Sequence, residues 1–130
     1  MAPHKPGTSA RLQVRRHRGA AAHARGLWAE RLAVWLLRLK GYRIVGCRVQ
    51  TRAGEVDIVA RKGRTLVIVE VKARPTLEEA AAALQPRQQT RLARAAEALA
   101  AREGEVDIRF DIVQVAPRRF PRHLRDAWRP

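Results

Sequence analysis

The chain has 130 residues, 46% of them hydrophobic, and a formal net charge of +15. This length allows one domain with a real core but not two. The lone Cys47 excludes a disulfide framework and fits a reducing cytoplasm. There is no run of about 18 apolar residues, which excludes a membrane-spanning helix, and the basic N-terminal stretch lacks the apolar segment of a signal peptide.

The positive charge is concentrated at the two ends of the chain. Residues 1–25 carry six Lys or Arg and no acid, and residues 117–130 carry five Arg against Asp126 alone. We therefore predict a mobile basic tail at 1–25, a domain at 26–116 and a second basic tail at 117–130. Such a charge favours nucleic acid as partner ahead of an anionic membrane surface, although a high-GC genome would also enrich the chain in arginine.

A first helix is predicted from about Gly26 to Lys40, with Gly41 as the residue that ends it. Its apolar residues form two stripes, so we expect the helix to be largely buried. Glu30 projects into the second stripe, where a carboxylate needs either a partner such as Arg31 or Arg43 or a role in a site. The first stripe comprises Trp28, Leu32, Trp35, Leu36 and Leu39, and the second comprises Ala33, Val34 and Leu37.

Three consecutive strands are predicted after this helix. The first runs from Tyr42 to Val49 and contains Cys47, which we expect to be a small core residue. The second and third cover residues 54–60 and 65–72, and both are rich in β-branched residues. A turn at residues 61–64 joins them as a hairpin.

Three carboxylates crowd one side of this hairpin. With residues 62–63 at the centre of the turn, Glu55 falls opposite Glu70, and Asp57 is then diagonal to Glu70. Like charges directly opposite each other destabilise a sheet. We expect Lys72, an arginine from elsewhere or a divalent metal to offset the repulsion, since carboxylate oxygens suit a hard cation.

The second half of the chain predicts two helices and a last strand. An Ala-rich helical segment begins after Thr76 as N-cap, with Glu79 completing a capping box. A longer helix runs from Pro86 to about Arg102 and ends at Gly104, and the strand at 105–115 can then lie parallel to an earlier one. The resulting prediction is an α/β fold of order α-β-β-β-α-β, with a mixed sheet flanked by helices. The buried stripe of the long helix comprises Leu92, Ala95, Ala96 and Leu99.

The charged hairpin also suggests a chemistry. Asp57 and Glu70 could share one Mg²⁺ or Mn²⁺, which activates a water and stabilises charge on a phosphate. Lys72, two residues after Glu70 on the same strand face, could orient or deprotonate the attacking water or neutralise a phosphate oxygen. Glu-x-Lys alone is a weak signal, because edge strands often carry charge.

The segments 54–59 (GEVDIV) and 69–74 (VEVKAR) resemble the YraN family of small bacterial proteins, and the likeness extends from about residue 26 to residue 115. That family resembles the PD-(D/E)XK nuclease superfamily, near the archaeal Holliday junction resolvases. The resemblance implies a restriction-endonuclease-like core with Asp57, Glu70 and Lys72 at the active-site positions. It also implies that Glu30 is the acid which many such enzymes add from the first helix.

The chain departs from the family pattern at two places. Val56 stands where the superfamily's name puts proline, and residues 88–89 read Gln-Gln where the family has Lys-Gln. Arg87 or Arg91 would then replace that lysine as a phosphate contact. With Arg74 and Arg94 these arginines form the predicted nucleic-acid-binding set, and a solvated basic helix face is the alternative for those at 87, 91 and 94. Asp111 recurs in the family, and a structural hydrogen bond and a catalytic role both stay open for it.

These observations predict a metal-dependent endonuclease of DNA, with branched or junction DNA as a candidate substrate. Trp28 and Trp35 are assigned to the core helix and Trp128 to a tail, so no aromatic ladder for single strands is expected. Two alternatives stay open: a non-catalytic nucleic-acid-binding module, and an interaction protein whose hairpin charges form a salt-bridge network. A homodimer is expected by analogy with resolvases, because cutting two strands needs two sites.

Overall fold

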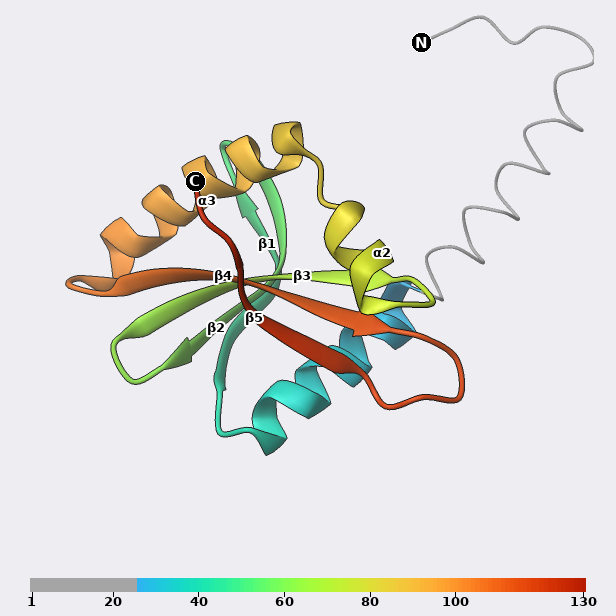
Figure 1. The fold of residues 1–130 in the computed structure, drawn as a ribbon. Helices are drawn as coiled ribbons and strands as arrows, with labels where there is room; N and C mark the ends of the chain where they lie inside the picture. The colour runs from blue at the N-terminus through green and yellow to red at the C-terminus, as the bar shows by residue number, and fades with distance from the viewer. Residues whose placement is uncertain (1–25) are drawn as a thin grey trace, which may run out of the picture.

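The computed structural model describes residues 26–130, so the predicted tail at 1–25 lies outside the described part of the chain. These residues form one five-stranded sheet with helices on both faces (Figure 1). The strands follow one another across the sheet in chain order, and all neighbours are antiparallel except β3 and β4, which are parallel. The strands are β1 (Arg43–Thr51), β2 (Gly54–Lys62), β3 (Thr65–Ala73), β4 (Asp107–Val115) and β5 (Arg122–Trp128).

The helices cover the two faces of the sheet separately. The first helix, residues 26–39, lies on one face, and α2 (Leu77–Ala82) and α3 (Pro86–Glu103) lie on the other (Figure 1). Side chains of the central strand β3 alternate between two core clusters, with Leu66 on the α3 side and Val67 on the side of the first helix. The predicted α/β fold with a mixed sheet is therefore confirmed. No helix within residues 26–130 is long and apolar enough to cross a membrane.

The first helix ends as predicted but is less buried than predicted. At its end Gly41 has φ 87°, and the amides of Gly41 and Tyr42 donate to the carbonyls of Arg38 and Leu37, which is a Schellman motif. The helix packs on the sheet through one buried stripe, which comprises Ala29, Ala33 and Leu37. Its opposite face is at the surface, so the expectation of a buried helix is wrong for Trp28, Trp35 and Leu39, which are 44%, 46% and 66% exposed.

The helices α2 and α3 follow the sequence prediction closely. The Thr76 side chain caps α2 by accepting a hydrogen bond from the amide of Glu79 at 3.1 Å. Helix α3 begins at Pro86 and is followed by Gly104 with φ 83°. Its predicted apolar stripe, Leu92, Ala95, Ala96 and Leu99, is buried against the sheet.

The structure differs from the prediction at residues 117–130, which form no simple tail. Strand β5 lies within this segment and pairs antiparallel with β4. Trp128 stacks on Phe110 with ring centroids 4.1 Å apart, and Leu124 packs against the same core cluster. The sequence of β5 shows no strict alternation of polar and apolar residues, and its arginines occupy exposed positions of this edge strand, so it gives little strand signal.

Candidate functional site

The β2–β3 hairpin has a different register from the predicted one. Lys62 pairs with Thr65, so Gly63 and Arg64 form a two-residue loop. Gly63 has φ 59° at the first loop position, as a II′-type hairpin requires. This shift of the turn by one residue moves the pairing by two, so that Asp57, and not Glu55, lies beside Glu70. The predicted register was wrong for this reason.

The ladder between β2 and β3 breaks where these acids meet. Regular pairing ends at Ile58 and Val69. Val56 belongs to the core cluster under α3, whereas Ile58 belongs to the cluster under the first helix, so the alternation of faces fails at Asp57. Arg48 on the neighbouring strand β1 has φ 47° at the same level of the sheet. A local distortion of both strands therefore creates the site.

The two carboxylates take over hydrogen bonds that the ladder loses. The amide of Asp57 donates to Glu70 Oε2 at 3.2 Å, and the amide of Val71 donates to Asp57 Oδ2 at 2.8 Å. Each acid thus binds the backbone of the opposite strand. This arrangement fixes both side chains and holds them against each other.

Burial and mutual repulsion change the ionisation of this pair. Glu70 is only 5% exposed. Its burial, and then the Asp57 carboxylate, raise the pKa of Glu70 to about 8. Without a cation, the pair therefore retains about one proton near neutral pH.

Arg91 reaches this pair from α3. Its Nη2 lies 3.6 Å from Glu70 Oε1, and its Nη1 donates to the Glu55 carbonyl at 2.7 Å. The guanidinium is therefore used inside the protein. The structure shows Arg91 in contact with Glu70 and the Glu55 carbonyl, and its role as a phosphate contact stays a prediction.

A cleft of about 650 Å³ opens beside Asp57, and Lys72 and Glu30 line it too. Glu30 lies 3.4 Å from Arg48 Nε, so its partner is Arg48 and neither Arg31 nor Arg43. Glu30 can therefore be both the partner of an arginine and part of the site, because both residues of the ion pair line the cleft. Glu70, which contacts Asp57, does not itself line the cleft. Further lining comes from Gly26, Leu27, Ala29, Glu55, Val71, Ala73 and Arg74.

The predicted nucleic-acid-binding arginines do not lie together. Arg74 lines the cleft, whereas Arg87 and Arg94 are exposed on α3, which covers the other face of the sheet. Arg48 lines the cleft and was missed by the sequence reasoning, because an isolated arginine in an edge strand gives no signal. Cys47, expected in the core, is exposed, since β1 is an edge strand.

Residues 29–115 match the sequence model described as "Uncharacterised protein family UPF0102". The chain belongs to the UPF0102 family. A UPF0102 protein of Parvibaculum lavamentivorans is 59% identical over 115 residues, which cover 86% of each chain. One of Sphingopyxis alaskensis is 51% identical over 113 residues, 85% of this chain and 97% of that protein. One of Caulobacter vibrioides is 50% identical over 118 residues, which cover 88% of this chain and 94% of that protein. The YraN resemblance is thereby confirmed, since UPF0102 is that family.

The donor set of this UPF0102 chain fits a small hard cation. Asp57 and Glu70 supply carboxylate oxygens in contact with each other, and a divalent ion would replace the proton that they share. Within residues 26–130, no group of three or more His, Cys, Asp or Glu side chains is arranged to hold a metal. Mg²⁺ and Mn²⁺ need only one or two carboxylates and complete their shells with water and phosphate oxygens. The pair therefore suits these ions better than zinc or calcium.

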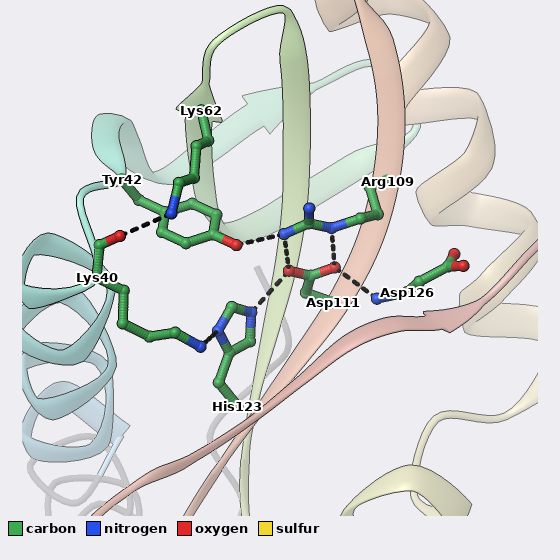
Figure 2. A network of polar contacts seen from close by, with 7 residues as sticks. All are labelled: Lys40, Tyr42, Lys62, Arg109, Asp111, His123 and Asp126. Carbon is green, nitrogen blue, oxygen red and sulfur yellow. Dashed lines mark hydrogen bonds and ion pairs between the residues drawn. The ribbon is translucent and has the colours of Figure 1, made fainter.

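A second polar network surrounds Asp111 on the sheet face covered by the first helix (Figure 2). Arg109 donates to both oxygens of Asp111, at 2.9 and 2.8 Å, and also bonds Tyr42. His123 Nε2 lies 2.7 Å from Asp111 Oδ2, and the Asp126 amide donates to Asp111 Oδ1 at 2.9 Å. Burial raises the pKa of this carboxyl, but the hydrogen bonds from His123, Arg109 and Asp126 outweigh burial and lower it to about 2.

This network joins β5 to the rest of the UPF0102 fold. Lys40 Nζ lies 2.6 Å from His123 Nδ1, and Lys62 Nζ donates to the Lys40 carbonyl at 2.8 Å. The end of the first helix, the hairpin and β5 thus meet at one buried carboxylate (Figure 2). Of the two roles left open for Asp111, the structure supports the structural hydrogen bond.

Proposed function

We propose that this UPF0102 protein is a divalent-metal-dependent endonuclease that hydrolyses phosphodiester bonds of DNA. The observation that carries the proposal is the Asp57–Glu70 pair, in which two carboxylates are held in contact at a break in the sheet beside an open cleft. The repulsion between the carboxylates and the burial of Glu70 both cost stability, although each acid also accepts a backbone hydrogen bond from the opposite strand. A cation at this position would offset these costs.

Each side chain has a proposed role in the reaction. Asp57 and Glu70 would hold Mg²⁺ or Mn²⁺, which when bound activates a water and stabilises charge on the phosphate. Lys72, in the same cleft, would orient the water or neutralise a phosphate oxygen. Glu30 would keep Arg48 in place and add negative charge near the ion. Arg74, at the edge of the cleft, would contact the DNA backbone.

The proposed substrate class is double-stranded or branched DNA. The net charge of +15 supports a polyanionic partner bound with strong salt dependence. A homodimer would provide two active sites for two strands, and we keep it as part of the proposal.

A non-catalytic nucleic-acid-binding module is the second candidate. The observation in its favour is that Glu70 is nearly buried and already paired with Arg91. A site of this kind could be closed to metal, with the carboxylates kept only as a link between strands. The two candidates make different predictions about cleavage.

The test is a cleavage assay with labelled linear duplex, single-stranded, flapped and four-way-junction DNA in Mg²⁺, Mn²⁺ or EDTA. We expect metal-dependent cutting by the wild type and its loss in Asp57→Asn and Lys72→Met. Asp107→Asn is the matched control, because the pentapeptide Gly-Glu-Val-Asp-Ile occurs at 54–58 and again at 104–108. Binding without cutting on every substrate would instead support the binding module.

A further inference from the structure

An exposed tryptophan lies next to the proposed active-site cleft. Trp28 is 44% exposed near the start of the first helix, and it shares a pocket with residues 73–75, which lie between β3 and α2. Its exposure contrasts with the core position that its apolar stripe predicts. Trp28 does not line the cleft itself, but it lines a pocket that adjoins it.

Trp28 forms one wall of a second pocket of about 360 Å³. This pocket shares Ala73 and Arg74 with the cleft, directly after Lys72 in the chain. Its remaining lining is mostly small and apolar. Two arginines line the pocket, and no acidic residue does. The full lining comprises Trp28, Ala73, Arg74, Pro75, Val115, Ala116, Pro117 and Arg119.

We propose that this pocket binds an unpaired nucleobase of the DNA substrate, stacked on Trp28. The apolar walls suit the faces of a base, and Arg74 and Arg119 suit the phosphates on either side of it. Because the pocket opens beside Lys72, the base would belong to a nucleotide near the phosphate in the cleft. This inference rests on the proposed function and narrows its substrate to DNA with an unpaired nucleotide at the cutting point, such as a flap or an overhang.

A comparison within the same helix supports this choice of tryptophan. Trp35 is exposed to a similar degree, at 46%, but it stacks on Phe120 with ring centroids 6.4 Å apart. It also lines a different pocket, with Cys47 and Arg38, that does not include Lys72 or Asp57. Trp35 is therefore a matched control for exposure, residue type and helix.

The test measures binding in EDTA, so that it does not depend on catalysis. Fluorescence anisotropy would compare a fully paired duplex, the same duplex with a short 5′ or 3′ flap, and that flap with abasic nucleotides at the branch point. The proteins are the wild type, Trp28→Ala, Trp28→Phe and Trp35→Ala. Arg119→Ala and Arg125→Ala compare an arginine of the pocket with one outside it. Circular dichroism confirms folding of each variant.

We expect the wild type to bind the flapped DNA more tightly than the duplex, and Trp28→Ala to reduce only the flap affinity, on the order of tenfold. Trp28→Phe should retain most of that affinity, and the abasic flap should bind the wild type as weakly as the normal flap binds Trp28→Ala. Equal effects of Trp28→Ala and Trp35→Ala, or equal binding of normal and abasic flaps, would overturn the proposal.

The outcome is separable from that of the nuclease proposal. A protein that cuts DNA in Mg²⁺ without any effect of Trp28→Ala on substrate preference would refute the base pocket alone. A protein that needs Trp28 to bind flaps but never cuts would refute the catalytic proposal alone.

Discussion

At the scale of single residues, the Asp57–Glu70 pair explains the local distortion of the sheet. Each carboxylate accepts a backbone hydrogen bond from the other strand, so the strands stay joined where their regular ladder has ended. The remaining problem is charge. Arg91 offsets part of the negative charge of the pair through Glu70, and a proton or a bound cation would offset the rest.

Arg91→Gln should destabilise the fold by about 1–2 kcal/mol, because it removes the cation beside a buried carboxylate and a hydrogen bond to the Glu55 carbonyl. The loss stays below that of a fully buried ion pair, because the raised pKa of Glu70, about 8, already leaves a proton on the pair near neutral pH. Urea unfolding of the wild type and the variant measures this loss of folding stability. Arg94→Gln, an exposed arginine on the same helix, is the control and should change stability little. Equal stability of both variants would show that Arg91 does not support Glu70.

Asp111 should make the fold sensitive to acid. Its pKa is lowered to about 2 in the folded protein from 3.8, so the unfolded chain binds the proton more readily as pH falls. Its contribution of about 2 kcal/mol is therefore present above pH 4 and lost as pH falls towards 2. Asp111→Asn should be less stable at pH 6, and its stability should fall less between pH 5 and 2. Urea unfolding over this range provides the check, and parallel curves for both proteins would contradict it.

At the scale of elements, helix ends and strand positions could be predicted, but strand register could not. Thr76, Pro86 and Gly104 are local signals, and each lies where the sequence predicts a helix to begin or end. The turn of the hairpin has two candidates, residues 62–63 and 63–64, and Gly63 belongs to both. The sequence therefore does not decide between them, and in the structure Gly63 is the first loop residue. The break at Asp57 could not be predicted, because the apolar pattern of β2 continues through it.

Gly54 links the start of β2 to Arg91. It has φ 128°, and a Cβ there would lie 2.8 Å from Arg91 Nη1. Gly54→Ala should therefore cost about 1–3 kcal/mol and lower any cleavage activity, by displacing the guanidinium that supports Glu70. Gly104→Ala is the control, since its φ is 83° but no atom lies within 4 Å of the added Cβ. Thermal unfolding compares them, and equal losses would show that only the backbone angle matters.

At the scale of the whole molecule, the sheet extends further than the sequence suggested. The mixed sheet with helices on both faces could be predicted from the order of elements. The fifth strand could not, because its function in the fold depends on long-range partners: Phe110 for Trp128, and Asp111 for His123. The same limit applies to the cleft, where Glu30, Arg48, Asp57 and Lys72 come from four separate segments. The hairpin predicts Asp57 and Lys72 in one site and the family resemblance adds Glu30, but nothing in the sequence predicts Arg48 beside them.

A chain that stops after Ala116 should fail to fold cooperatively. It lacks β5, which exposes the edge of β4 and leaves Asp111 without the hydrogen bonds from His123 and the Asp126 amide. Burying that carboxylate with fewer partners is costly. Circular dichroism melting of the truncated and full chains is the measurement. A truncated chain with a sharp, unshifted transition would show that residues 117–130 are dispensable for folding.

If Asp57 and Glu70 form a catalytic metal site, DNA cleavage must depend on the Glu70 carboxylate, which Glu70→Gln removes. Glutamine keeps the size of the side chain and an oxygen that can accept from the Asp57 amide, and it removes both the repulsion from Asp57 and the ion pair with Arg91, so the variant should still fold in EDTA. The account predicts that its cleavage rate in Mg²⁺ falls about a hundredfold or more. Cleavage at the wild-type rate by the folded variant would contradict the account and leave the pair a structural link between two strands.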